Sequence, residues 1–185
     1  KQLFFKNAIT EILWIYQEQS NDVRWLQERK NHIWDEWMVD ADGIYRIYEP
    51  TKENYIYDKD KEVDLYDLDN NIMLDKDGNK IKVKSNIEGK NIKAAKFYGK
   101  EYAYTIGTAY GWIVNRYKLT QNLIDTIKSN PNDRRLVMSL WQNEFLKTAV
   151  LPSCVWSSEW DVTDGYLNLS VHQRSCDVPL GLPFN

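Results

Sequence analysis

Residues 154–174 read CVWSSEWDVTDGYLNLSVHQR, and this alternation of apolar and polar residues decides how the last part of the chain folds. A period of two gives a strand one apolar face, so the stretch predicts strands over 154–162 and 166–174. Asp164 and Gly165 lie between them, and Asp-Gly is typical of a tight hairpin turn. Residues 136–141 predict a third strand. Gln173 shares a face with the apolar row of the last strand, where it is either a ligand contact or a satisfied core amide.

Three helices are predicted before these strands. Apolar residues at three- and four-residue spacing predict a helix over 5–16 with one buried face; they are Phe5, Ala8, Ile9, Ile12, Leu13 and Tyr16. Asn21 or Asp22 is placed to cap a second, short helix through Lys30. Thr120 is placed to cap a third helix, which Asn130 and Pro131 end.

Composition limits the possible functions. The 185 residues carry 24 Lys plus Arg and 27 Asp plus Glu, a net charge of −3, which excludes a polybasic nucleic-acid arm or an acidic tail as the main function. Hydrophobic residues make up 43% of the chain, enough for one sizeable core, and no apolar run approaches the roughly 20 residues of a membrane span. Cys154 and Cys176 make a poor disulfide framework, so we expect free thiols in the cytoplasm.

Residues 49–105 differ from the rest of the chain. All eight tryptophans lie outside 38–111, while 49–77 holds ten acids against four lysines and 78–100 holds one acid against seven lysines. Asp77-Gly78 predicts a hairpin between residues 72–74 and 81–84. We therefore expect a small polar inserted domain over 49–105, between catalytic-domain segments 1–48 and 106–185. No internal repeat stands out, and the chain is expected to be a fragment.

Cys154 is the first candidate for chemistry. It follows a Pro-containing turn at the start of a strand, where its sulfur could act as a thiolate nucleophile; the alternative is a buried, inert thiol. The pairs Arg134-Arg135 and Arg174-Ser175 are suited to phosphate, whose oxygens match the guanidinium fork, unless they form surface ion pairs. The spacing of His32 and His172 relative to the cysteines argues against a metal site.

Several separated blocks resemble the thymidylate synthase family. The residues are Trp141, LPSC at 151–154 and QRSCDVPLGLPFN at 173–185, with EILW at 11–14, IWDEW at 33–37, AYG at 109–111 and DRR at 133–135. The resemblance covers about 1–37 and 107–185. It implies an α+β fold, a mixed sheet with packed helices and a small polar inserted lobe. Family features at both ends lack counterparts here, so this chain alone is not expected to turn over.

The resemblance also implies a methyltransferase that converts dUMP to dTMP with 5,10-methylenetetrahydrofolate. Cys154 would add to C6 of the pyrimidine, and the other implied catalytic residues are Glu11, Tyr110 and Asp177. The implied dUMP-binding residues are Gln173, Arg174, Ser175 and Asn185, with Arg134 and Arg135 reaching the phosphate site of the partner in a homodimer. The implied folate-binding residues are Ile33, Trp34, Trp37, Asp177, Leu180, Gly181 and Phe184, and Cys176 is expected to pack beside the site.

Two other functions stay open. A deoxypyrimidine nucleotide hydroxymethylase on the same fold would let water intercept the intermediate. A non-catalytic module would instead bind nucleic acid through the lysine-rich residues 80–100, with affinity that falls steeply as salt rises. The acidic stretch beside those lysines would cancel much of the attraction, so nucleic acid is the least favoured partner.

Overall fold

The computed structural model describes residues 5–51 and 55–176. The chain divides into two compact units, a main unit made of 1–33 and 108–185 and a second unit, here called the lobe, from Trp34 to Gly107. The inserted domain expected over 49–105 lies within the range of the lobe. The lobe also contains residues 34–48, which were expected to belong to the catalytic domain.

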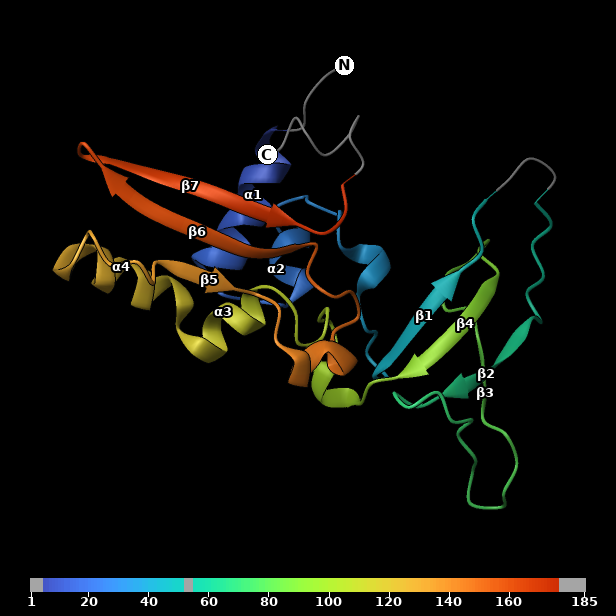
Figure 1. The fold of residues 1–185 in the computed structure, drawn as a ribbon. Helices are drawn as coiled ribbons and strands as arrows, with labels where there is room; N and C mark the ends of the chain where they lie inside the picture. The colour runs from blue at the N-terminus through green and yellow to red at the C-terminus, as the bar shows by residue number, and fades with distance from the viewer. Residues whose placement is uncertain (1–4, 52–54, 177–185) are drawn as a thin grey trace. The chain divides into compact units, whose positions relative to one another are not determined.

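The main unit combines helices with one antiparallel sheet (Figure 1). Its helices are α1 (Phe5–Tyr16), α2 (Val23–Gln27), α3 (Gly111–Tyr117), α4 (Leu119–Ser129) and the 3-10 helix η3 (Asn143–Thr148). Its strands are β5 (Val137–Ser139), β6 (Val155–Thr163) and β7 (Tyr166–Gln173), in the order β5-β6-β7. The α+β class and the three predicted strands are confirmed.

The turn between β6 and β7 has the predicted form. Asp164 and Gly165 both have positive φ, 52° and 79°, as a two-residue hairpin turn that matches the strand twist requires. Thr163 then pairs with Tyr166, and the register continues from there with one irregularity between Val155 and Ser157. The predicted hairpin is therefore confirmed.

The predicted face of α1 is wrong. The buried residues of this helix are Thr10, Trp14 and Ile15, whereas Phe5 and Ile12 of the expected stripe are 66% and 51% exposed. Trp14 is fully buried and its Nε1 donates to the carbonyl of Asp22 at 3.0 Å, which fixes α1 against the segment before α2. Because this indole is the largest side chain of the helix, its contacts decide which face turns inward.

The ends of the other helices differ in part from the predictions. Asp22 caps α2 as expected, its carboxylate accepting from the backbone N–H of Arg24 at 2.9 Å, but the helix ends at Gln27. Thr120 does not cap α4, which begins at Leu119 after a left-handed Lys118. The Thr120 hydroxyl instead donates to the carbonyl of Tyr16 at 2.9 Å and ties α4 to the end of α1.

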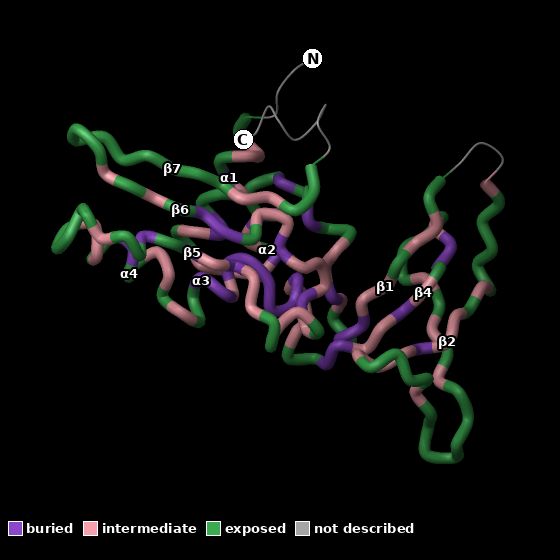
Figure 2. Tube along the Cα trace, in the orientation of Figure 1, coloured by how far each residue is buried: buried purple, intermediate pink, exposed green. Residues whose placement is uncertain are grey.

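The sheet is buried mainly toward β5. Met138 of β5 forms a core cluster with Leu123 and Leu136, and Trp160 of β6 packs against it. The apolar row of β7 is about half exposed in the part of the chain that the structure describes, with Leu169 at 50% (Figure 2). Burial of this sheet therefore concentrates at the β5–β6 side, where α4 contacts β5.

The lobe is a separate small sheet. Its strands are β1 (Ile44–Tyr48), β2 (Glu62–Tyr66), β3 (Lys82–Lys84) and β4 (Ile92–Phe97), in the order β1-β4-β2-β3, with 3-10 helices η1 (Asp35–Trp37) and η2 (Lys100–Tyr102). Ile44, Leu65, Ile92 and Ala95 form its core. Leu74 bridges to Lys80 around Asp77-Gly78, so the predicted turn is confirmed. The predicted pairing is wrong beyond Ile81, because β3 (Lys82–Lys84) pairs with residues 62–64 of β2 instead of with 72–74.

Turns of the lobe repeat, which the sequence analysis missed. Asp67 and Asp75 make the same hydrogen bonds: each carboxylate accepts from the backbone N–H two and four residues later, at 2.8–2.9 Å. Asp58 makes the first of these bonds, to the N–H of Asp60 at 2.9 Å. The shared signal is Asp-x-Asp at 58, 67 and 75, which places one side-chain-closed turn before each of three apolar segments of the lobe, 63–65, 72–74 and 81–83.

Among the residues that the structure describes, none of the helices combines the length and hydrophobicity needed to span a membrane.

Candidate functional site around Cys154

The segment that carries Cys154 is held by the end of β7. Cys154 directly precedes β6 and is half-buried, and its carbonyl accepts from the backbone N–H of Arg174 at 2.9 Å. The Arg174 side chain reaches back over the same turn, donating from Nη2 to the carbonyl of Pro152 at 2.8 Å and from Nε to that of Ser153 at 3.2 Å. One arginine therefore fixes three successive peptide groups, and with them the direction of the thiol.

Two donors converge on the sulfur. The Nη2 group of Arg174 lies 3.8 Å from Cys154 Sγ, and the hydroxyl of Ser175 lies 3.5 Å from it. The thiolate is the reactive form of cysteine, and a neighbouring guanidinium stabilises negative charge on sulfur. The arrangement suits a thiol that must act as a nucleophile and later as a leaving group.

Tyr110 supports the segment that carries the Cys154 thiol. Its phenol oxygen accepts from the backbone N–H of Cys154 at 2.8 Å, and the side chain is 6% exposed. Burial raises the pKa of this phenol well above its usual value, and the Cys154 side chain and the Glu11 carboxylate raise it further, against the hydrogen bond from the Cys154 N–H. The phenol therefore stays protonated.

The backbone of Tyr110 is also unusual. Its φ of 47° and ψ of −110° lie outside the regions that non-glycine residues ordinarily occupy, just before α3 begins. Such a conformation persists only where neighbours over-determine it, and it is frequent at functional sites. Here the next residue, Gly111, packs closely against the backbone of Ser20. A Cβ built on Gly111 would lie 2.0 Å from the carbonyl oxygen of Ser20, so this contact restrains the backbone beside Tyr110.

Glu11 of α1 lies near the same phenols. Its charge raises the pKa of Tyr110 and, after burial, that of Tyr16, so the carboxylate is electrostatically coupled to both rings. Glu11 is itself half-buried. The structure thus gathers Cys154, Tyr110 and Glu11 with Arg174 and Ser175, five of the residues expected from the sequence, from four separate segments of the main unit.

The remaining predicted residues are placed differently. Gln173 Nε2 donates to the carbonyl of Ser175 at 2.7 Å, so its amide shapes the chain after β7. Arg134 and Arg135 are exposed between α4 and β5, and Arg135 pairs with Asp133 at 2.8 Å, which lowers the pKa of that carboxyl. Cys176 is exposed, so the expectation that it packs is wrong.

The residues expected to bind folate fall in several places. Ile33 is 51% exposed in the main unit, while Trp34 and Trp37 lie in the lobe, where their rings meet edge to face at 5.6 Å. The other predicted positions lie outside the described residues; they are Asp177, Leu180, Gly181, Phe184 and Asn185.

Sequence reasoning missed two supports of the site. The backbone carbonyls of Pro152 and Ser153 accept hydrogen bonds from the Arg174 side chain. A pattern of side chains in the sequence does not predict which backbone carbonyls will accept such bonds. Gly111 allows the close approach of Ser20, and the available signal was a glycine at the first position of a helix directly after a candidate tyrosine.

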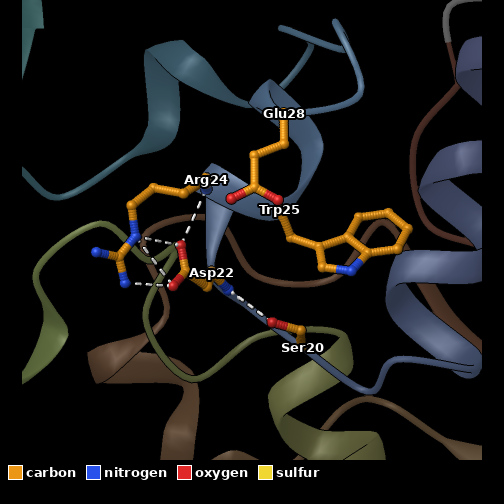
Figure 3. Close-up of a pocket in the computed structure, with 5 residues that line it drawn as sticks. All are labelled: Ser20, Asp22, Arg24, Trp25 and Glu28. Atoms are coloured by element: carbon orange, nitrogen blue, oxygen red, sulfur yellow. Dashed lines mark hydrogen bonds and ion pairs between the residues drawn. The ribbon is translucent and has the colours of Figure 1, made fainter.

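A hollow of about 330 Å³ lies elsewhere in the main unit, beside α2 (Figure 3). It is lined by Ser20, Asp22, Arg24, Trp25 and Glu28. Asp22 and Arg24 form an ion pair there. Burial raises the pKa of Asp22, but the hydrogen bonds from Arg24 outweigh it and lower this pKa below its usual value. Because none of the predicted site residues lines it, this hollow is not the candidate site.

The described residues contain no group of three or more His, Cys, Asp or Glu side chains able to hold a metal ion. Around the Cys154 thiol lie a guanidinium, a hydroxyl, a phenol and a carboxylate. A thiol among such groups defines a candidate site for covalent cysteine chemistry in this α+β chain.

Comparison with known proteins identifies the family. A family model described as thymidylate synthase matches residues 1–185. The chain belongs to the thymidylate synthase family. Among similar proteins, thymidylate synthase of Clostridium beijerinckii is 35% identical over 185 residues, covering 100% of this chain and 47% of its own.

Two further relatives agree. Thymidylate synthase of Leuconostoc mesenteroides is 34% identical over 202 residues, covering 100% of this chain and 57% of its own. The solved structure of thermostable thymidylate synthase A from Bacillus subtilis is similar with a TM-score of 0.62 and 27% identity, covering 100% of this chain and 47% of that one. The chain spans about half the length of the curated relatives it matches.

Proposed function

We propose that the protein to which these residues belong catalyses the reductive methylation of dUMP to dTMP, with 5,10-methylenetetrahydrofolate as one-carbon donor and reductant and dihydrofolate as product. The observation that carries the proposal is the convergence of Arg174 and Ser175 on the sulfur of Cys154. The family of the chain supports the substrate assignment. Because the chain spans about half of its relatives, the activity is proposed for the longer protein.

In this proposal Cys154 Sγ adds to C6 of the uracil ring. The electron pair of the C5–C6 double bond moves toward the C4 carbonyl oxygen, so that C5 becomes able to form a bond to a one-carbon unit. Negative charge must then be stabilised at O4, and Glu11 would supply or accept protons there through water. Tyr110, whose phenol stays protonated, would hold the Cys154 segment in place beside the ring.

Release requires the reverse movement of electrons. After C5 has lost its proton and the bond between the one-carbon unit and the folate nitrogen has broken, a hydride would complete the methyl group. The electron pair would then return to C5–C6 as the C6–S bond breaks and the thiolate departs. Arg174 and Ser175 would stabilise the departing thiolate, as they do for the attacking one. The same two side chains would also bind the phosphate of dUMP, to which charge-assisted hydrogen bonds from a guanidinium are well suited.

The folate supplies the one-carbon unit and the hydride when it is bound. Trp34 and Trp37 form an edge-to-face aromatic pair in the lobe, and flat apolar surfaces of this kind fit a pterin ring. On a bound folate such rings would exclude water, which favours hydride transfer over capture of the reactive carbon by water.

We further propose a homodimer in the cytoplasm. Arg134 and Arg135 are exposed and would serve the phosphate site of a partner subunit. Cys154 is a thiol that forms no disulfide, as is usual in reducing compartments.

The test is dihydrofolate formation, followed by absorbance, with the longer protein, dUMP and methylenetetrahydrofolate. We expect turnover by the parent, and Cys154→Ser should abolish it while dUMP binding, measured by calorimetry, stays largely intact. Turnover by Cys154→Ser near the parental rate would remove the assigned nucleophile. Consumption of dUMP without dihydrofolate would favour the hydroxymethylase instead.

A further inference from the structure

Trp141 is anchored beside the candidate site. It follows β5, is half-buried, and its indole Nε1 donates to Asn143 Oδ1 at 3.0 Å. Its backbone carbonyl accepts from the hydroxyl of Ser139 at 3.2 Å. Two hydrogen bonds therefore hold both the ring and the main chain, so the indole presents a fixed face.

That face lies against Arg174. The guanidinium carbon of Arg174 is 5.9 Å from the centroid of the Trp141 ring, within the range of about 6 Å over which a cation is attracted to an aromatic face. The same guanidinium donates to the Pro152 carbonyl and reaches Cys154 Sγ. Arg174 is thus held from two sides, by the ring and by the turn that carries the thiol.

We propose that Trp141 is a positioning residue, which holds the Arg174 guanidinium in place beside Cys154 and thereby sets the reactivity of this thiol. The inference rests on the proposed function only in taking Cys154 as the nucleophile. An arginine has a long, flexible side chain, and its effect on a sulfur depends on where its planar head rests. The Trp141 ring restricts the guanidinium to the position from which its Nη2 reaches both the Pro152 carbonyl and Cys154 Sγ.

The test is the rate at which iodoacetamide alkylates Cys154 in the 185-residue chain at about pH 7, where the thiolate is the reacting form. Mass spectrometry of the Cys154 peptide separates this reaction from that of Cys176. We expect Trp141→Leu to slow alkylation about two- to five-fold, the range that matches an exposed cation–π contact. Trp141→Phe keeps an aromatic face and should restore most of the rate.

Trp25→Leu is the matched control. Trp25 also carries a stacked arginine, with the Arg29 guanidinium carbon 3.5 Å from its ring centroid, but that pair lies on and just after α2 and has no part in the contacts of Cys154. Its removal should leave the alkylation rate at the parental value. A general loss of packing after removal of a tryptophan would slow both variants.

A double-mutant cycle separates positioning from structure. In an Arg174→Gln background, Trp141→Leu should have no further effect, because the ring then has no guanidinium to hold. Equal slowing in both backgrounds, or parental alkylation by Trp141→Leu itself, overturns the proposal. If Trp141→Leu does not fold, Asn143→Ala replaces it in the test, because this exposed residue orients the indole. Slower alkylation by Asn143→Ala in the parental background, but not in the Arg174→Gln background, supports the proposal. Alkylation by Asn143→Ala at the parental rate overturns it.

Alkylation needs neither dUMP nor folate. A failure of the inference therefore leaves the dihydrofolate assay unaffected, and a failure of the proposed function leaves the coupling between Trp141 and Arg174 measurable.

Discussion

Gly111→Ala adds a single methyl group where the main unit has no room for it. The new Cβ would lie 2.0 Å from the carbonyl oxygen, 2.6 Å from the nitrogen and 2.7 Å from the carbonyl carbon of Ser20. All three are backbone atoms, and the Ser20 N–H already donates to the Trp14 carbonyl at 3.1 Å, so they cannot rotate away. Either α3 or the segment before α2 must move.

Two effects oppose each other in this variant. Alanine in a helix is favoured over glycine by about 1 kcal/mol, an upper limit at the first residue of α3. Overpacking costs about 1–3 kcal/mol, and contact with backbone places this site at the upper end. We therefore expect a net loss of about 2 kcal/mol, which for a chain of this size lowers Tm by about 4–8 °C.

Thermal unfolding followed by circular dichroism measures this loss. Gly78→Ala is the contrast, since nothing lies within 4 Å of its added Cβ and only its positive φ of 83° opposes alanine. Because Gly111 follows Tyr110, the displacement should also disturb the hydrogen bond to Cys154 and change the alkylation rate of the thiol. A Gly111→Ala protein that melts at or above the parental temperature would refute the steric reasoning.

Three further outcomes are expected. Tyr110→Phe removes the acceptor of the Cys154 N–H and should cost about 1–3 kcal/mol in urea unfolding, so an unchanged free energy of unfolding contradicts the role of the phenol. Asn91→Ala removes a 5% exposed carboxamide that accepts from the Asp58 N–H and donates to the Ile56 carbonyl. It should speed amide hydrogen exchange in the lobe, with the amides of the main unit as the internal control. Exchange in the lobe at the parental rate would contradict this role of Asn91. Hydrogen bonds from the Asn79 backbone hold the pKa of Asp75 below its usual value, so the turn is stabilised above about pH 4 and loses this stabilisation as the pH falls further. Asp75→Asn should abolish that acid dependence of amide exchange at Gly78, and an unaltered pH profile would contradict it.

The strands were predictable because their signals are local. Apolar and polar residues alternate along 159–162 and 167–172, and Asp164-Gly165 supplies the positive φ that the turn needs. The inward face of α1 was not predictable in the same way. The buried residues Trp14 and Ile15 are apolar, and so are the exposed residues Phe5 and Ile12. The helix therefore carries apolar residues on more than one face. Periodicity reports which residues are apolar, but the neighbour that receives a side chain decides which of them is buried.

The sequence predicts the candidate site as a set of residues but not as an arrangement. Resemblance to the family named Cys154, Tyr110, Arg174 and Ser175 together, yet the bond from the Cys154 N–H to the phenol joins positions 44 residues apart. The Arg174 clamp on the turn likewise joins positions 21 and 22 residues apart. Such pairings depend on how the sheet and helices close on one another, which side-chain periodicity does not encode.

The two units consequently differ in how substitutions should act on them. In the lobe, Asp58, Asp67 and Asp75 bond to residues two or four positions away, so each turn is closed by its own neighbours. Removal of one carboxylate should loosen one turn and leave the other two in place. In the main unit, Arg174 links β7 to the turn before β6, and Cys154 joins that turn to Tyr110 at the start of α3. A substitution at either residue alters segments that are distant in sequence, so its effects on stability and on thiol reactivity should appear together.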